Sequence, residues 1–97
     1  MPRFDVYQLN SALVVDVQTN YLPAIATRLV IPLETLQNAP LRTPRLNPTL
    51  DVGGQRRVLI PQQMASIPAQ QLRNKIGSLL DQSDEITDAI DVLLTGF

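Results

Sequence analysis

The side chains that could do chemistry in this 97-residue chain are carboxylates and guanidinium groups, because the sequence contains neither histidine nor cysteine. These absences exclude thiolate chemistry and disulfide bonds, and they remove the commonest metal ligand and the commonest general base near neutral pH. Arg28, paired with Asp16 or with Glu34, remains as a candidate acid–base site. We nevertheless expect no catalytic residue and no cofactor, and the composition favours a binding protein over an enzyme.

A second candidate is a row of carboxylates near the C-terminus. Asp84, Asp88 and Asp91 are spaced so that they share one face of a helix. Such a face is more often solvated than bound to Ca²⁺, so we expect no metal site. Gly53-Gly54 is too short to cradle a phosphate, and no Lys-Ser/Thr pair follows it.

The charges are unevenly distributed along the chain. Residues 1–75 hold all eight basic residues and four acids, a net charge of +4, whereas residues 76–97 hold five acids and no base, a net charge of −5. The overall charge of −1 argues against direct binding of nucleic acid. The N-terminal segment lacks the pattern of a signal peptide and no apolar run could span a membrane, so we expect a cytoplasmic protein.

The elements that position these groups divide the chain in two. All eight prolines lie between Pro2 and Pro68. Within that region, β-branched and partly alternating segments predict strands over residues 4–7, 13–17, 28–33, 49–52 and 55–60. Gly53-Gly54 predicts a tight hairpin turn, residues 37–48 predict a loop, and Pro32 predicts an edge or a bulge because it cannot donate a ladder hydrogen bond.

The C-terminus has the period of a helix. Its apolar residues follow one stripe and are Ile86, Ala89, Ile90, Leu93, Leu94 and Phe97. Ser83 or Asp84 is expected to cap the first turn, and Gly96 to end the helix. The stripe continues to the last residue, beside the free carboxylate, which suggests that a partner covers its end. The residues alone therefore indicate one small domain, residues 1–97, rich in β-structure and with a C-terminal helix.

Four segments, taken in order, resemble the CcdB toxin family. They are Val15-Asp16-Val17-Gln18, Arg28-Leu29-Val30-Ile31-Pro32-Leu33, Met64-Ala65-Ser66-Ile67-Pro68, and a tail with Ile86-x-x-Ala89-Ile90 that ends in Thr95-Gly96-Phe97. The resemblance covers nearly the whole chain. It implies a mainly β fold, an SH3-like antiparallel β-barrel with a C-terminal α-helix, in a homodimeric plasmid-maintenance or chromosomal toxin of a type II toxin–antitoxin pair.

The resemblance also implies a target. Toxins of this family bind the DNA gyrase A subunit, trap the cleaved-DNA complex and are neutralised by a cognate antitoxin, without a membrane or direct nucleic-acid binding. The gyrase-binding residues then fall on Tyr21, Leu22, Asp91, Leu94, Thr95, Gly96 and Phe97. Here Thr95 stands in place of the family's tryptophan, Phe97 in place of isoleucine, Asp91 where asparagine is usual and Tyr21 where an aliphatic residue is usual.

Two alternative functions remain open. The same barrel resembles the MazF/Kid endoribonuclease toxins, for which Arg28, Arg42, Arg45, Arg56 and Arg57 would have to supply the positive charge that holds RNA phosphates. The third hypothesis, favoured by the missing tryptophan, is an inactive relative that only binds antitoxin.

Overall fold

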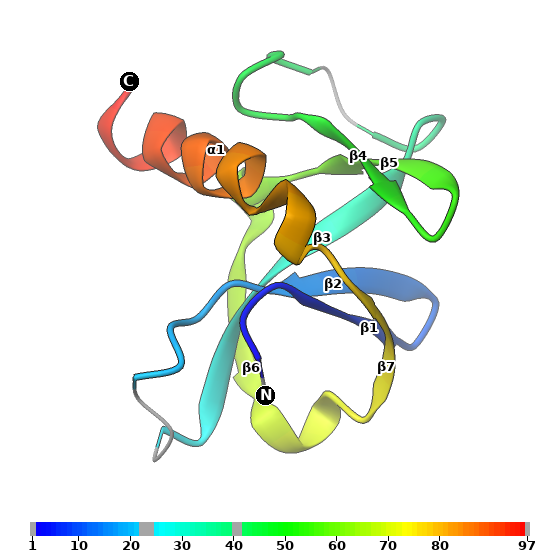
Figure 1. The fold of residues 1–97 in the computed structure, drawn as a ribbon, viewed down its shortest axis with the longest axis vertical. Coiled ribbons are helices and arrows are strands. Elements are labelled where there is room, and N and C mark those ends of the chain that lie inside the picture. Colours follow the sequence, from blue (N-terminus) through cyan, green and yellow to red (C-terminus); the bar gives the residue numbers. More distant parts are fainter. Residues whose placement is uncertain (1, 22–24, 40–41, 97) are drawn as a thin grey trace.

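A computed structural model describes residues 2–21, 25–39 and 42–96 of the chain. Its strands form one antiparallel sheet in the order β4-β5-β3-β2-β1-β7, and β6 pairs with β3 off this path. The sheet curls into a half-barrel, and α1 lies against it beside β4 and β5 (Figure 1). The elements are β1 (Asp5–Leu9), β2 (Ala12–Asp16), β3 (Thr27–Thr35), β4 (Thr49–Val52), β5 (Gln55–Leu59), β6 (Ala65–Pro68), β7 (Asn74–Ser78) and α1 (Ser83–Thr95). The predicted mainly β barrel with a C-terminal helix is confirmed.

The predicted strands are present within one or two residues at each end. Gly53 and Gly54 form the predicted hairpin turn between β4 and β5, with φ angles of +60° and +87° that a residue with a side chain rarely adopts. The sequence did not predict β7, whose residues are mostly exposed and include polar side chains and a glycine. β7 exists because it pairs with β1 along the edge of the sheet.

The central strand, β3, changes partner part-way along one edge. It pairs with β6 over Thr27–Val30 and with β5 over Leu33–Thr35. Pro32 lies at the break between these two partners, where its carbonyl accepts a hydrogen bond from the Ile60 backbone N–H at 3.1 Å. β3 is a central strand, but the predicted edge position holds locally, because neither β6 nor β5 pairs with Pro32 along this edge. The edge of β3 that a backbone N–H at Pro32 would face has no strand partner at this position, because β6 pairs only up to Val30 and β5 only from Leu33. A hydrogen-bond donor is therefore not needed there.

The two faces of the sheet are covered by separate groups of buried side chains. On β2, Leu13 and Val15 belong to the main core, whereas Val14 points to the opposite face. Ile86 and Ala89 of α1 are fully buried in the main core, and burial of a side chain such as Ile86 contributes about 1.5–3 kcal/mol. The helix therefore closes one face of the sheet.

The opposite face has a smaller cluster that contains Tyr7, Val14, Val30 and Leu72. Beside it, Arg28 donates to Asp16 through two hydrogen bonds, Nε to Oδ2 at 2.7 Å and Nη2 to Oδ1 at 3.0 Å. Both side chains are buried, with 6% of Arg28 and none of Asp16 exposed. The pair links β2 to β3 away from water.

The start of α1 differs from the prediction. Neither Ser83 nor Asp84 caps the helix, because Ser83 is already helical and no side chain caps the first turn. The preceding residue, Gln82, instead bonds Asp51 of β4 through its amide, accepting from the backbone N–H and donating to the carbonyl, both at 2.9 Å. Gln82 therefore fastens the start of the helix to the outer edge of β4.

We expect Asp16→Asn to lower the free energy of unfolding by about 3–5 kcal/mol, because it leaves a buried guanidinium without its counter-ion. Arg45→Ala is the matched control, since it breaks an exposed ion pair with Asp88 and should cost less than about 1 kcal/mol. Urea unfolding of both variants measures the difference. Equal losses in the two variants would contradict a structural role for the buried pair.

Candidate functional site

The end of α1 carries apolar and acidic side chains that the fold does not bury. The buried part of the stripe ends at Ala89, with Ile90 packed against the core and Leu93 half-buried. Beyond it Leu94 is 70% exposed, and Asp91 and Thr95 are exposed as well. The predicted stripe is therefore core at its beginning and surface at its end. Phe97 lies outside the described residues.

The last turn of α1 is closed by local hydrogen bonds. The Thr95 hydroxyl donates to the Asp91 carbonyl at 2.7 Å, and the Gly96 N–H donates to the Val92 carbonyl at 2.9 Å. Gly96 ends the helix as predicted, in the left-handed conformation at φ +82°. Asp91, Leu94, Thr95 and Gly96 therefore form a defined tip, which we call the helix tip.

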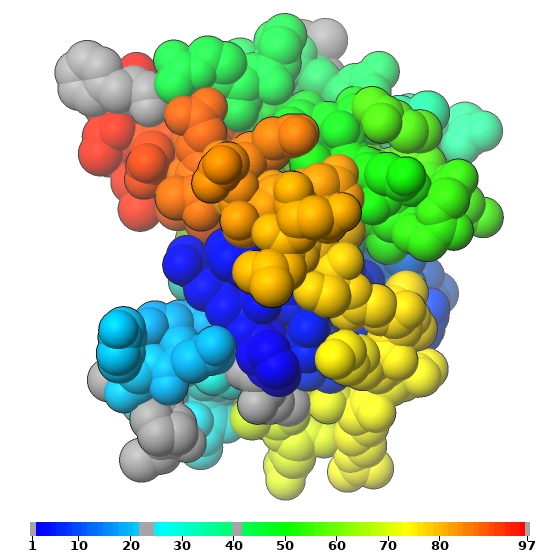
Figure 2. All heavy atoms as spheres, viewed as in Figure 1, coloured from blue at the N-terminus to red at the C-terminus, as the bar shows by residue number. Residues whose placement is uncertain are grey.

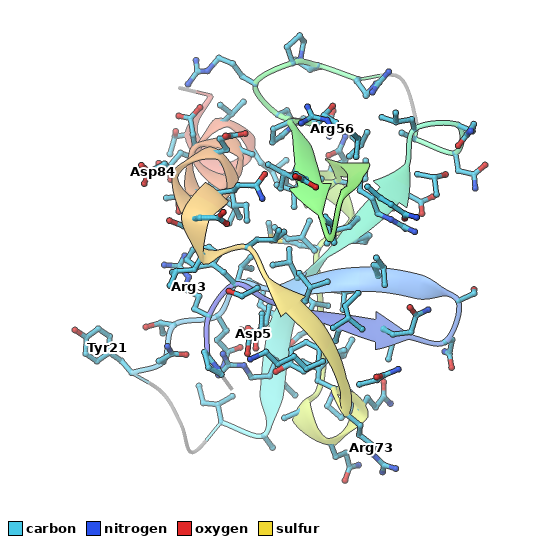
Figure 3. All side chains as sticks on the ribbon, turned by 45° about the vertical axis from the view of Figure 1, so that its right-hand side comes forward. Arg3, Asp5, Tyr21, Arg56, Arg73 and Asp84 are labelled. Carbon is cyan, nitrogen blue, oxygen red and sulfur yellow. The ribbon has the colours of Figure 1, made fainter. Side chains whose placement is uncertain are left out.

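The second predicted strip, Tyr21 and Leu22, lies in the segment between β2 and β3. Tyr21 is 92% exposed, and its backbone N–H donates to the Thr19 hydroxyl at 3.2 Å. Its ring points away from the body of the molecule (Figure 3). Leu22 lies outside the described residues. In the space-filling view the end of α1 and the segment around residue 20 are two separate projections on the same side of the molecule (Figure 2).

In the described part of the loop before β4, Arg45 is a cationic neighbour of the acidic face of α1. Arg45 Nη2 lies 3.4 Å from Asp88 Oδ1, with both side chains more than half exposed, so the pair is weak. Asn47 anchors this loop, because its buried amide donates to the Leu59 carbonyl at 3.1 Å. Among the described residues, no three acidic side chains are grouped as metal ligands, and this includes the candidate row on α1.

The candidate acid–base pair is Arg28 with Asp16, not with Glu34. Its two hydrogen bonds and its burial make it a structural pair, out of reach of a substrate. The same interaction removes Arg28 from the cations that could hold an RNA phosphate. The arginines at 42, 45 and 56 are exposed and Arg57 is half-buried.

Sequence reasoning missed a second ion pair near this cluster. Lys75 Nζ of β7 lies 3.2 Å from Oδ2 of Asp5, whose side chain is 3% exposed. The two residues are far apart in the chain, and the only signal in the sequence is that Lys75 is its sole lysine. Register decides the pairing, because β7 adds to β1.

Tyr7 lies beside these charges. Burial raises the pKa of the Tyr7 phenol above its usual value of 10.0, and the nearby Asp5 and Asp16 carboxylates raise it further, while Arg28 acts in the opposite direction. The folded protein therefore holds the Tyr7 proton more tightly than the unfolded chain does. The phenol is buried and serves no accessible site.

Several solved structures have a similar fold, among them a toxin and two endoribonucleases of mycobacteria. The Mycobacterium tuberculosis toxin MazF-mt6 matches with a TM-score of 0.70 and 21% identity, covering 94% of this chain and 93% of its own. An endoribonuclease in complex with its cognate antitoxin, from a Mycobacterial species, matches with a TM-score of 0.76 and 16% identity over 97% and 95% of the two chains. A further Mycobacterial endoribonuclease reaches 0.77 at 16% identity over 97% and 90%. At these identities the likeness concerns the fold.

The sequence itself assigns the family. The model of the CcdB protein family matches residues 3–96, so the chain belongs to the CcdB family. It is thus a toxin of the toxin–antitoxin type. No curated protein gives a significant sequence match. None of the described helices is both long enough and apolar enough to cross a membrane.

The raised pKa of Tyr7 predicts a loss of stability in alkali. Well below pH 10 the phenol is protonated in both states and its contribution to stability is complete. As the pH rises through 10, the unfolded chain loses the proton more readily than the folded protein does, so stability falls. Tyr7→Phe should lack this part of the fall, whereas Tyr21→Phe should keep it. Urea unfolding between about pH 8 and 11 tests the difference.

A Lys75→Arg background makes this comparison clean, because arginine stays protonated beside Asp5 over the whole range. In that background, the free energy of unfolding is plotted against pH for Tyr7→Phe and for its parent. Parallel plots would show that Tyr7 has the same pKa in the folded and unfolded states and would contradict the prediction.

Proposed function

We propose that this protein is a gyrase poison, which binds the DNA gyrase A subunit through the helix tip and traps the cleaved-DNA complex. It acts in the cytoplasm as a homodimer and is neutralised by a cognate antitoxin. Membership of the CcdB family supports the class of protein, and the exposure of Leu94 at the end of an otherwise core-facing stripe supports the site.

The helix tip has the properties of a binding anchor. A large aliphatic side chain that is 70% exposed contributes nothing to the core, yet it offers apolar area to a partner. Gly96 ends the helix in the left-handed conformation, and one residue follows it in the sequence. Phe97 is that residue, and it is the only aromatic residue after Tyr21 in the sequence.

The departures from the family pattern change the chemistry expected of the target. Loss of a tryptophan anchor costs on the order of 2 kcal/mol of binding, and Phe97 offsets part of it. Asp91 adds a charge to the carboxylates already on α1, so a cationic pocket in the partner fits this tip best. An antitoxin partner is supported by the similar Mycobacterial endoribonuclease, which was solved with its cognate antitoxin.

Ribonuclease activity is the second candidate, favoured by the similarity of the fold to the Mycobacterial endoribonucleases. Against it, the chain has no histidine to act as a base, and Arg28 is held by Asp16. The inactive relative that only binds antitoxin is the third. One set of assays separates all three: linear plasmid after incubation with gyrase and supercoiled DNA, cleavage of a long RNA, and growth arrest on induced expression.

We expect deletion of Thr95–Phe97 to abolish gyrase binding and growth arrest, yet to lower the free energy of unfolding by less than about 1 kcal/mol, because chain ends add little to global stability. Phe97→Ala alone should weaken gyrase binding at least tenfold, about 1.4 kcal/mol. Leu94→Ala should weaken it as well. Leu80→Ala, which truncates an equally exposed leucine away from the tip, is the matched control and should change nothing.

Two results would contradict this site. If the shortened chain unfolds, its last residues belong to the core. If it still linearises plasmid with gyrase, the helix tip is not the binding site.

The homodimer is a separate prediction. The stripe residues left half-buried, such as Leu93, would gain cover from a second copy of the chain. Light scattering at micromolar concentration should give twice the 10.8 kDa mass of the chain. A mass of one chain at every concentration would be incompatible with this assembly.

A further inference from the structure

Among the described residues, the carboxylate of Asp5 forms an ion pair with one exposed amine, that of Lys75. Only 3% of the Asp5 side chain is exposed, and its Oδ2 makes no hydrogen bond within the described residues. Lys75 Nζ lies 3.2 Å from that oxygen. Burial of a carboxylate without a counter-ion is costly, so the Lys75 charge is what makes an ionised Asp5 tolerable here.

The other nearby cation is already engaged. Arg28 is bound to Asp16 through two nitrogens and also donates to the Gln18 carbonyl at 3.2 Å. Asp5, Asp16, Arg28 and Lys75 together sum to zero charge on this face of the sheet. Loss of the Lys75 charge leaves a net charge of −1 beside the buried Tyr7. The Asp5 carboxylate already raises the pKa of the Tyr7 phenol.

The position of Lys75 makes this charge accessible from outside. It lies on β7, the last strand of the sheet path, opposite Tyr7, next to a register shift at Ile76. Its side chain is 53% exposed, and it is the sole lysine of the chain. One half of the ion pair is buried and fixed, and the other half reaches solvent.

We propose that the Lys75 amine is a modification site for an activated acyl donor, an acyl phosphate or an acyl thioester, and that its acylation loosens β7 from β1. The Nζ ammonium first leaves the ion pair and loses one proton to solvent. The neutral amine then attacks the acyl carbon, a C–N amide bond forms, and the C–O or C–S bond to phosphate or thiolate breaks. The displaced amine proton passes to solvent. The resulting amide is neutral and cannot balance Asp5.

The effect reaches the helix through the chain connection. β7 leads through the short 3-10 turn Leu80–Gln82 into α1, and the Leu79 N–H donates to the Phe4 carbonyl at 2.8 Å just beyond the ion pair. Weaker pairing of β7 with β1 therefore also weakens the segment that connects the sheet to α1. This inference rests on the ion pair and is independent of the gyrase proposal.

The first test is chemical. The folded protein and its Lys75→Arg variant are incubated with acetyl phosphate, and the products are mapped by peptide mass spectrometry. We expect an acetyl amide at Lys75 in the parent, and in the variant no modification beyond the N-terminal amine. An acetylated N-terminus with an unmodified Lys75 would overturn the proposal.

The second test isolates the charge. Lys75→Gln, which mimics the neutral amide, should raise the unfolding equilibrium constant in urea at least tenfold, whereas Lys75→Arg should change it less than threefold. Arg45→Gln, which breaks the exposed pair with Asp88, is the matched control and should also stay below threefold. Adding Asp5→Asn to Lys75→Gln should recover most of the loss, because the uncompensated carboxylate is then absent.

Hydrogen exchange locates the effect, with faster exchange expected in β7 and unchanged exchange in β4. A Lys75→Gln variant as stable as the parent, or a double variant no more stable than Lys75→Gln, would overturn the proposal. If Lys75→Gln does not fold at all, folding of the double variant supports it and failure of both contradicts it.

Discussion

The partner change along β3 is the constraint on which the rest of the structure depends. One nine-residue strand must pair with β5 at one end and with β6 at the other, while β2 occupies its opposite edge. Pro32 lies at the junction, where a residue without an N–H loses nothing. Because β5 and β6 leave the same edge in different directions, the sheet curls, and the curl creates the concave face that α1 closes (Figure 1).

The second face of the sheet is stabilised by charges as well as by apolar contact. A small chain cannot cover both faces of a sheet with large side chains, and this one has no tryptophan. On its second face, the buried Arg28–Asp16 pair joins β2 to β3 and the half-buried Lys75–Asp5 pair joins β7 to β1. Both pairs act as cross-strand links, and in both the loss of the cation leaves a buried carboxylate without its counter-ion.

The helix divides along its length into a part that packs in the core and a part that stays on the surface. Its first half supplies Ile86 and Ala89 to the core, and Gln82 fastens its start to β4. Its last turn is closed by its own hydrogen bonds and exposes Leu94. Because the core does not include the helix tip, apolar and acidic side chains can be exposed there without loss of core packing.

The sequence by itself determined the local elements. Alternation gave the longer strands, Gly53-Gly54 the hairpin turn, the apolar stripe the helix and Gly96 its end, because each depends on neighbours in the chain. The ordered motifs also pointed to the family. Only the tertiary structure decided that Pro32 lies in a central strand and that Arg28 pairs with Asp16. It also decided that Gln82 bonds β4 in place of a helix cap, and that Lys75 forms the ion pair with Asp5. These are contacts between distant segments, which the register of the strands fixes and no local pattern records.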